Sequence, residues 1–221
     1  MLNFPISTIF GKKVPKEIFY NKMEIGTSIK RSFVDDIEQI IWQNKLSSKT
    51  INVGVGKKVL EIEILYVTLK KKNCNYLVYE FIDKNLPQYT VFVLNFKDES
   101  QLLINFKEPV ENKKGKFKIT ASYKTDWIPS SDITLTIDGL NMDMVYEGFV
   151  KQIADDKIVV PIESDIKQSI ETSQNIEKLE KRITELENKI RKEKQFNIQL
   201  KYSNKVKELQ KQLKNLKKIT D

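Results

Sequence analysis

Apolar and polar residues alternate in several short runs of the first 140 residues, which is the pattern of β-strands. In the run at 59–69, Glu61 and Glu63 fall on one face and Leu60, Ile62 and Ile64 on the other. Four further runs, rich in β-branched and aromatic residues, are predicted as strands at 89–96, 101–106, 116–124 and 132–138. These five runs predict one sheet, and the short connections between the middle ones favour a largely antiparallel arrangement.

Three segments of the same region have helical spacing instead. Residues 27–46 are predicted as a helix with a stripe that begins at Ile29 and Phe33. Residues 75–86 are predicted as a second helix, which Pro87 ends. Residues 141–154 are predicted as a third, its apolar stripe formed by Met144, Phe149 and Ile153.

The segment before these elements, residues 1–26, is interrupted by proline and glycine and is predicted to be irregular. The pattern over residues 1–160 therefore predicts an α+β domain. We expect a single mixed, largely antiparallel sheet of about five strands with about three helices, an ordinary size for one hydrophobic core.

Residues 161–221 form a tail with coiled-coil spacing that is broken once. One apolar stripe comprises Ile176, Leu179, Ile183, Leu186 and Ile190, and a second comprises Val206, Leu209, Leu213 and Leu216. At ~100° per residue, an unbroken helix would place Val206 about 160° around from Ile190. Either a straight helix has a partner on each side, or the tail folds back as a helical hairpin. Four pairs of stripe residues are centred near residue 198, which favours a hairpin turning within 195–203.

The same tail is predicted to be the protein-binding part of the chain. Phe196 and Leu200 belong to neither stripe, so they would lie at the tip of the hairpin, either as a docking point or to seal the turn. The predicted partner-binding residues are Phe196, Leu200, Ile183, Leu186, Ile190, Val206, Leu209 and Leu213. A homodimer through the coil is an alternative use of these residues.

Charge changes this picture because it is concentrated in the tail. The whole chain has a net charge of +8, and residues 189–221 contain eleven lysines and arginines but three acids, so they hold the entire excess. Lysine ammonium groups suit phosphates better than base edges. The candidates for contact with a nucleic-acid backbone are Lys192, Lys194, Lys201, Lys205, Lys211 and Lys214. The alternative is a solvated helical face.

Composition excludes several kinds of catalytic site. The chain has no histidine and one cysteine, Cys74, so histidine-dependent triads, zinc fingers and disulfide frameworks are excluded. No apolar run approaches the ~18 residues that span a bilayer, and the first residues lack a secretory signal pattern. We therefore expect a cytoplasmic protein with no membrane partner, no cofactor and no dedicated metal site.

One enzymatic alternative remains, a Mg²⁺-dependent nuclease that uses Asp98, Glu111 and Lys113. Glu61 and Glu63 could also bind a metal together, although an exposed sheet face is the simpler interpretation. Residues 51–58, Ile-Asn-Val-Gly-Val-Gly-Lys-Lys, are a weak match to a phosphate-binding loop, because they lack the spacing of a P-loop.

Several stretches of the chain resemble a bacterial family called domain of unknown function 4391. They are the segment Val-Pro-Lys-Glu-Ile-Phe-Tyr-Asn-Lys-Met-Glu-Ile, the run Ile-Trp-x-x-Lys-Leu-Ser-x-x-Thr-Ile-Asn at 41–52, and Ile-Arg-Lys-Glu-Lys-Gln-Phe-Asn from 190. The resemblance implies a gene context of helicases and DNA methyltransferases in restriction-like or anti-phage loci. It makes Lys45, Ser47, Thr50 and Asn52 candidates for a binding edge, with capping and turn chemistry as the simpler interpretation.

These observations together predict a non-enzymatic accessory subunit. Its coiled tail would bind a larger helicase or methyltransferase, and its lysines would add non-specific DNA contacts. A Mg²⁺-dependent nuclease and a homodimeric scaffold are the alternatives.

Overall fold

A mixed sheet forms the centre of the first of two units, residues 1–155 and 156–221. The computed structural model describes residues 2–21, 25–110, 117–158 and 165–220. The strands follow one another in the sheet in chain order, and β7 pairs with β5: β1 (Ile9–Lys13), β2 (Ile37–Ser47), β3 (Glu61–Leu69), β4 (Tyr89–Phe96), β5 (Glu99–Pro109), β6 (Phe117–Lys124) and β7 (Ile128–Pro129). Every pair is antiparallel except β3 and β4, which are parallel.

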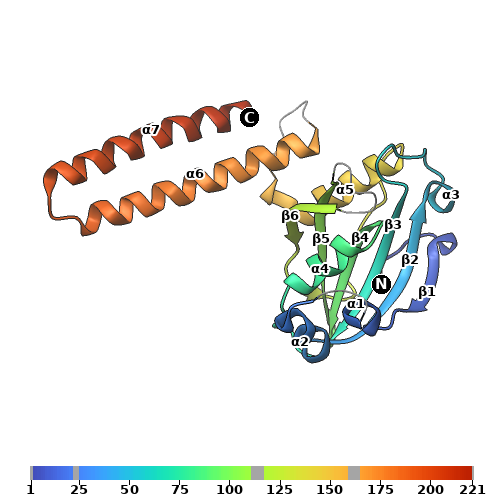
Figure 1. Cartoon of the computed structure of the whole chain (residues 1–221). Coiled ribbons are helices and arrows are strands. Elements are labelled where there is room, and N and C mark those ends of the chain that lie inside the picture. The colour runs from blue at the N-terminus through green and yellow to red at the C-terminus, as the bar shows by residue number, and fades with distance from the viewer. Residues whose placement is uncertain (1, 22–24, 111–116, 159–164, 221) are drawn as a thin grey trace. The chain divides into compact units, whose positions relative to one another are not determined.

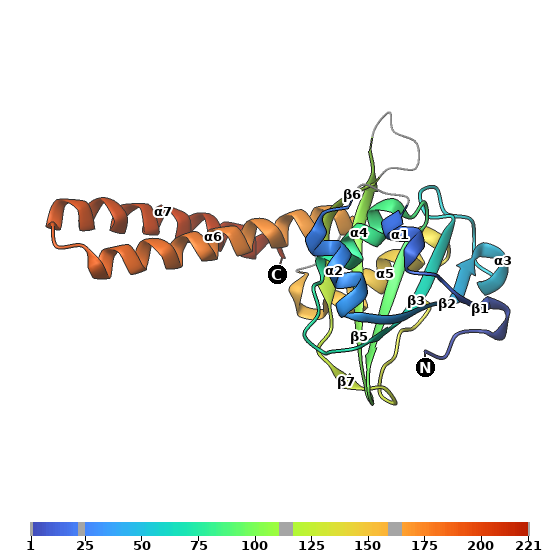
Figure 2. The same cartoon turned by 60° about the horizontal axis from the view of Figure 1, so that its bottom comes forward.

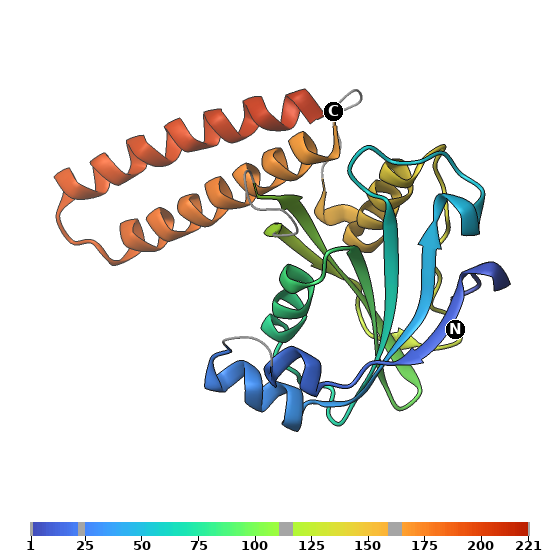
Figure 3. The ribbon, with the colours of Figure 1, turned by 45° about the vertical axis from the view of Figure 1, so that its right-hand side comes forward.

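Helices cover both faces of this sheet (Figures 1 and 3). One face carries α1 (Glu17–Asn21), α2 (Thr27–Asp35) and α4 (Leu77–Asn85), and the other carries α5 (Met142–Ala154). The helix α4 is the crossover that makes β3 and β4 parallel, as such a connection must. The one-turn helix α3 (Ser48–Ile51) directly follows β2, and two short 3-10 turns lie at Ile6–Thr8 and Asp155–Lys157.

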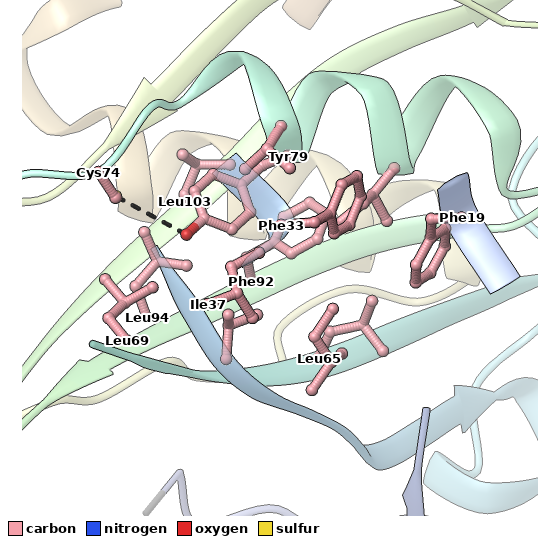
Figure 4. Close-up of a cluster of buried hydrophobic side chains, with 14 residues drawn as sticks. Phe19, Phe33, Ile37, Leu65, Leu69, Cys74, Tyr79, Phe92, Leu94 and Leu103 are labelled. Carbon is pink, nitrogen blue, oxygen red and sulfur yellow. Dashed lines mark hydrogen bonds between the residues drawn. The ribbon is translucent and has the colours of Figure 1, made fainter. Parts of the chain in front are cut away.

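The hydrophobic core beneath α2 and α4 explains why these helices lie on that face. Phe33 from α2 and Tyr79 from α4 are completely buried against side chains of β3, β4 and β5 (Figure 4). Phe33 stacks on Phe19 of α1 at 5.7 Å between ring centroids, and Tyr79 packs on Phe92 at 5.4 Å. Burying an aromatic side chain of this size contributes roughly 2–3 kcal/mol, so this cluster is a major source of the stability of the unit.

Most predicted strands and two predicted helices are confirmed. The runs at 59–69, 89–96 and 116–124 contain β3, β4 and β6, and the run at 101–106 lies within the longer β5. The segments at 75–86 and 141–154 contain α4 and α5. The sheet is larger than predicted, because β1, β2 and β7 were not expected. The described part of the first unit also has five α-helices, α1 to α5, where about three were predicted, because the short helices α1 and α3 have no long apolar stripe. The predicted domain boundary at residue 160 falls within 159–164, outside the described residues.

The predicted helix over 27–46 is wrong in its second half. The helix ends at Asp35, and β2 runs from Ile37 to Ser47, paired with β3 along its whole length. Ile37 and Ile40 are completely buried in the core cluster that includes Phe33 and Tyr79. Their three-residue spacing fits a helix locally, but the long-range pairing with β3 decides the structure because β-propensity depends on context.

Two further predictions are corrected at the other end of the unit. Residues 132–138 do not form a strand; instead the Gln152 side chain bonds both the N–H and the C=O of Thr136, at 2.8 Å each. A side chain thus supplies the hydrogen bonds that a neighbouring strand would have made. In α5, Met144 is 44% exposed, while Phe149 and Ile153 are buried as predicted.

The second unit is a helical hairpin, as the mirrored stripes predicted. Helices α6 (Ile166–Lys192) and α7 (Phe196–Thr220) lie side by side in every view (Figures 1 and 2). The turn is at 193–195, at the edge of the predicted range. The Glu193 carboxylate accepts hydrogen bonds from the N–H groups of Lys194 and Gln195, at 2.9 and 3.0 Å. This local bonding ends α6 without glycine or proline.

Candidate functional site

The hairpin is held by a closed apolar seam between its two helices. Its buried members and the side chains packed around them are Ile183, Leu186, Val206, Leu209, Leu179, Ile190, Tyr202 and Leu213. An ion pair of 2.8 Å between Lys217 and Glu180 joins the helices further along. Six of the predicted partner-binding residues therefore face each other inside the hairpin. Partner binding stays a prediction. Of the predicted partner-binding residues, Phe196 and Leu200 at the tip of the hairpin are the exposed ones.

The tip of the hairpin carries two exposed apolar side chains. Phe196 is the first residue of α7 and is 73% exposed, and Leu200, one turn later, is 49% exposed. Neither side chain is buried by the turn. An exposed aromatic next to an exposed leucine is typical of a contact site for another macromolecule.

A row of lysines continues from this tip along the outside of α7. At ~100° per residue, Lys207, Lys211 and Lys214 lie within about 60° of one another and on the side of the helix away from the seam. All three are exposed, and none has an ion-pair partner among the described residues. Phe196 and Leu200 fall on the same side of the helix. We call Lys207, Lys211 and Lys214 the outer row.

Of the predicted backbone-binding lysines, one is paired with an acid and two belong to the outer row. All six, Lys192, Lys194, Lys201, Lys205, Lys211 and Lys214, are exposed. Lys205 pairs with Glu208 at 2.8 Å, which partly neutralises it. Lys211 and Lys214 belong to the outer row. Lys207 was missed, although its spacing of four and seven residues from these two was visible in the sequence.

The predicted binding edge at 45–52 lies where β2 ends and α3 begins. The Thr50 hydroxyl accepts a 2.8 Å hydrogen bond from the N–H of Ser47, and the two side chains form a capping box. Asn52 ends α3 in the left-handed conformation, with φ of 54°. Three of the four residues thus support local structure. Lys45 differs, since it pairs with Glu61 at 2.8 Å.

Lys45 and Glu61 belong to a polar group that the sheet brings together at the start of β3. Glu63 lies beside Lys45 on one side and Thr90 on the other, because these residues are register partners across β2, β3 and β4. Glu63 is 5% exposed and Thr90 is completely buried. We call Lys45, Glu61, Glu63 and Thr90 the acidic corner.

The electrostatics of the acidic corner are unusual for a sheet face. Burial and then the neighbouring Glu61 carboxylate raise the pKa of Glu63 to about 7, against the opposing influence of Lys107 and Lys45. No hydrogen bond to the Glu63 carboxyl is formed within the described residues. The predicted exposed sheet face is therefore wrong for Glu63, because the sheet extends on both sides of β3.

A buried ion pair between α4 and β5 stands next to this corner. Asp83 and Lys107 are both completely buried, with 2.7 Å between the carboxylate and Nζ. Nζ also donates to the carbonyls of Asp83, Leu86 and Gln88, the last two just beyond the end of α4. Burial raises the pKa of Asp83 and lowers that of Lys107 in spite of their attraction. Because both partners are fully bonded, the pair ties α4 to the sheet and is not a free reactive group.

The predicted phosphate-loop signal at 51–58 has an internal explanation. The N–H groups of Lys57, Lys58 and Val59 converge on the Asp143 carboxylate, at 2.7, 3.0 and 2.7 Å. These bonds lower the pKa of Asp143, although burial alone would raise it. The loop does bind an anion, but the anion is a side chain of the same chain. A Cβ on Gly56 would lie 2.2 Å from the Val59 carbonyl oxygen, so this approach requires glycine.

Of the predicted nuclease trio, only Asp98 lies within the described residues, so the trio stays a prediction. Glu111 and Lys113 lie outside the described residues. Asp98 directly precedes β5, whose eleven residues end at Pro109, and at ~3.3 Å per residue the two ends of such a strand are more than about 30 Å apart. Cys74 is a buried free cysteine, and burial raises the pKa of its thiol, which disfavours the reactive thiolate.

Within the described residues, no group of three or more histidine, cysteine, aspartate or glutamate side chains is placed to hold a metal ion. The same part of the chain contains no helix that is long and apolar enough to cross a bilayer.

Comparison with known proteins gives one match. The family model described as domain of unknown function (DUF4391) matches residues 2–213, which confirms the resemblance found in the sequence. No curated protein matches the chain, and no solved structure does.

Proposed function

We propose that this chain, which belongs to the family described as domain of unknown function (DUF4391), is an accessory subunit that holds a larger DNA-processing protein on DNA. The outer row would bind the DNA backbone, and the hairpin tip would bind the protein partner. The observation that carries this proposal is the placement of both features on one side of α7, with the apolar seam on the other.

The charge of the outer row supports backbone contact. Three lysines spaced by four and three residues follow the helix axis at intervals of about 6 and 4.5 Å. Duplex DNA carries a dense row of phosphates, and each lysine that neutralises one of them releases counterions. Because the lysines have no acidic partner among the described residues, no ion pair within that part of the chain must be broken when DNA binds.

The exposed tip supports a protein partner. The seam buries the stripes of both helices within one chain, so the tail does not need a second copy to cover them. Phe196 and Leu200 are left exposed, and aromatic side chains are enriched where proteins bind each other. We assign the partner to the helicase or DNA methyltransferase class, which is the gene context that the family resemblance implies.

DNA binding is tested with the full chain and a fluorescein-labelled 20-base-pair duplex. Replacing Lys207, Lys211 and Lys214 together by glutamine is expected to weaken binding at least about tenfold at low salt, because each phosphate contact contributes separately. The matched control replaces three exposed lysines of the first unit, Lys49, Lys118 and Lys151, and removes the same charge. Equal losses in both triple variants would mean that net charge alone, not the outer row, binds DNA.

Partner binding is tested by native pull-down with the tagged chain from its own cells. Wild type is expected to recover a helicase or DNA methyltransferase, and the variant with Phe196→Ser and Leu200→Ser is expected to lose it. The control changes two exposed apolar residues of the first unit, Val55→Ser and Leu60→Ser. Recovery of no DNA enzyme by wild type, or undiminished recovery by the tip variant, would contradict the proposal.

A further inference from the structure

We propose that the first unit binds single-stranded DNA on a surface where three aromatic rings each have a lysine ammonium group over them. The rings are Tyr76, Phe96 and Trp127, and the lysines over them are, in the same order, Lys124, Lys97 and Lys72. We call these six residues the ring face. The ring face belongs to the first unit and does not need the hairpin to bind DNA; the choice of DNA over RNA rests on the proposed function.

The ring face forms where β4 turns into β5, on the side of the sheet that α4 covers. Phe96 and Glu99 are register partners across that turn. Gln101 lies two residues further along β5, so it faces the same way as Glu99 at a distance of about 6.6 Å. The side-chain carbonyl of Gln101 accepts a 2.8 Å hydrogen bond from the Tyr76 hydroxyl. The start of β5 therefore holds two of the three rings near each other.

Lys72 connects the third ring to this group. Its ammonium group bonds the Glu99 carboxylate at 2.6 Å and lies 5.4 Å from the centroid of the Trp127 ring. The side chains of Lys72 and Glu99 are 42% and 41% exposed. An ion pair between side chains as exposed as these contributes little to stability. Lys72 can therefore leave Glu99 for a phosphate group at small cost.

The combination of rings and lysines favours a nucleic acid over other partners. All three rings are half-buried, since each packs against the core beneath α4 and keeps part of its surface accessible. An ammonium group lies 3.5 to 5.4 Å from every ring centroid, so a base that stacks on a ring brings its phosphate close to a positive charge. Proteins that bind single strands without sequence preference combine stacking rings with positive charge in this way. Duplex DNA keeps its bases inside the helix, where these rings do not reach them.

The ring face is less basic than the outer row, because acids stand among its lysines. Glu99 pairs with Lys72, and the exposed residues Asp98 and Asp126 directly precede β5 and Trp127 in the chain. Binding of a single strand to the ring face is therefore expected to depend chiefly on stacking and only weakly on salt. Duplex binding by the outer row is expected to depend strongly on salt, so the two proposals differ in a property that can be measured.

The experiment titrates the full chain into a fluorescein-labelled oligothymidine of about 20 nucleotides, and saturable binding is expected. Trp127→Ala is expected to weaken this binding at least about fivefold, because a stacked base is lost. Trp127→Leu keeps an apolar side chain on the core and is expected to do the same, which covers the case that the alanine variant does not fold. The matched control is Phe10→Ala on β1, which removes a half-buried ring with Lys12 over it at 4.6 Å and is expected to leave binding unchanged.

The fluorescence of Trp127 gives a second readout. In the variant Trp42→Phe, Trp127 is the only tryptophan of the chain, and oligothymidine is expected to quench it. The same quenching is expected after the outer row has been changed to glutamine. Duplex binding that the outer-row variant keeps would contradict the function proposed for the hairpin and leave this result intact.

Four results would overturn the proposal for the ring face. They are absence of saturable oligothymidine binding by wild type, undiminished binding by folded Trp127→Leu, an equal loss in Phe10→Ala, and no quenching of Trp127. An oligouridine that binds at least about tenfold more tightly than oligothymidine would overturn the assignment to DNA.

Discussion

Replacement of Glu63 by glutamine should stabilise the protein at alkaline pH. Folding raises the pKa of Glu63 from its ordinary value of 4.5 to about 7, so the folded state holds this proton more tightly than the unfolded state does. Stability is therefore lost as pH rises from about 4.5 to 7, and the full loss is present above pH 7. At 1.36 kcal/mol per pKa unit, the loss is about 3 kcal/mol. Glutamine carries no charge at any pH, so the variant avoids this loss of stability.

The assay is urea unfolding of wild type and Glu63→Gln at pH 5, 6, 7 and 8, with EDTA present. Both tryptophans, Trp42 and Trp127, lie in the first unit, so their fluorescence reports unfolding of that unit alone. The advantage of the variant in free energy of unfolding is expected to be small at pH 5 and to approach about 3 kcal/mol at pH 8. Other titrating groups are common to both proteins and cancel in the difference.

A difference in unfolding free energy that stays constant within about 0.5 kcal/mol from pH 5 to pH 8 would refute this reasoning. It would mean that Glu63 is solvated or paired in the folded protein.

Three further perturbations test other parts of the structure. Lys107→Met leaves the buried Asp83 carboxylate unpaired and should lower the free energy of unfolding in urea by about 3–5 kcal/mol. Adding Asp83→Asn to the same chain should recover part of this loss. A loss below about 1 kcal/mol would contradict a buried pair. Leu186→Ala and Leu209→Ala should show a coupling of about 0.5–3 kcal/mol in a double-mutant cycle of hairpin unfolding, and strictly additive losses would argue against direct packing. Asp143→Asn weakens the bonds from three N–H groups and should cost about 1–3 kcal/mol at pH 7. Because these bonds lower the pKa of Asp143 below 3.8, the cost should shrink only as pH falls through that lowered pKa; a cost that stays constant on acidification would contradict the charge-assisted bonds.

The elements that the sequence predicted correctly are those whose pattern is decided locally. The hairpin was predictable because both apolar stripes are visible in the sequence, from Ile176 to Ile190 and from Val206 to Leu216. Their residues form pairs that are centred on the same position near residue 198. Its turn lies nearer the N-terminus than that centre, because the Glu193 side chain bonds the next two N–H groups and ends α6 early. Single-residue side-chain bonding of this kind has no periodic signature.

The errors occurred where pairing over long sequence distances decides the structure. Residues 37–47 have apolar spacing that fits a helix as well as a strand, and only β3, more than ten residues away, makes them β2. The burial of Glu63 was missed for the same reason. Alternation placed Glu61 and Glu63 on one face, but the burial of Glu63 depends on β2 and β4, which the sequence pattern did not place beside it.

The salt dependence of DNA binding tests the proposed function most directly. For each phosphate that a lysine neutralises, the slope of log K against log salt concentration is about −0.9, so removing Lys207, Lys211 and Lys214 should reduce the magnitude of that slope by about 2.7. The control that changes Lys49, Lys118 and Lys151 should keep the wild-type slope. If the outer row binds DNA, the two triple variants differ in this way between 50 and about 200 mM salt. An unchanged slope in the outer-row variant would show that α7 does not hold the DNA backbone.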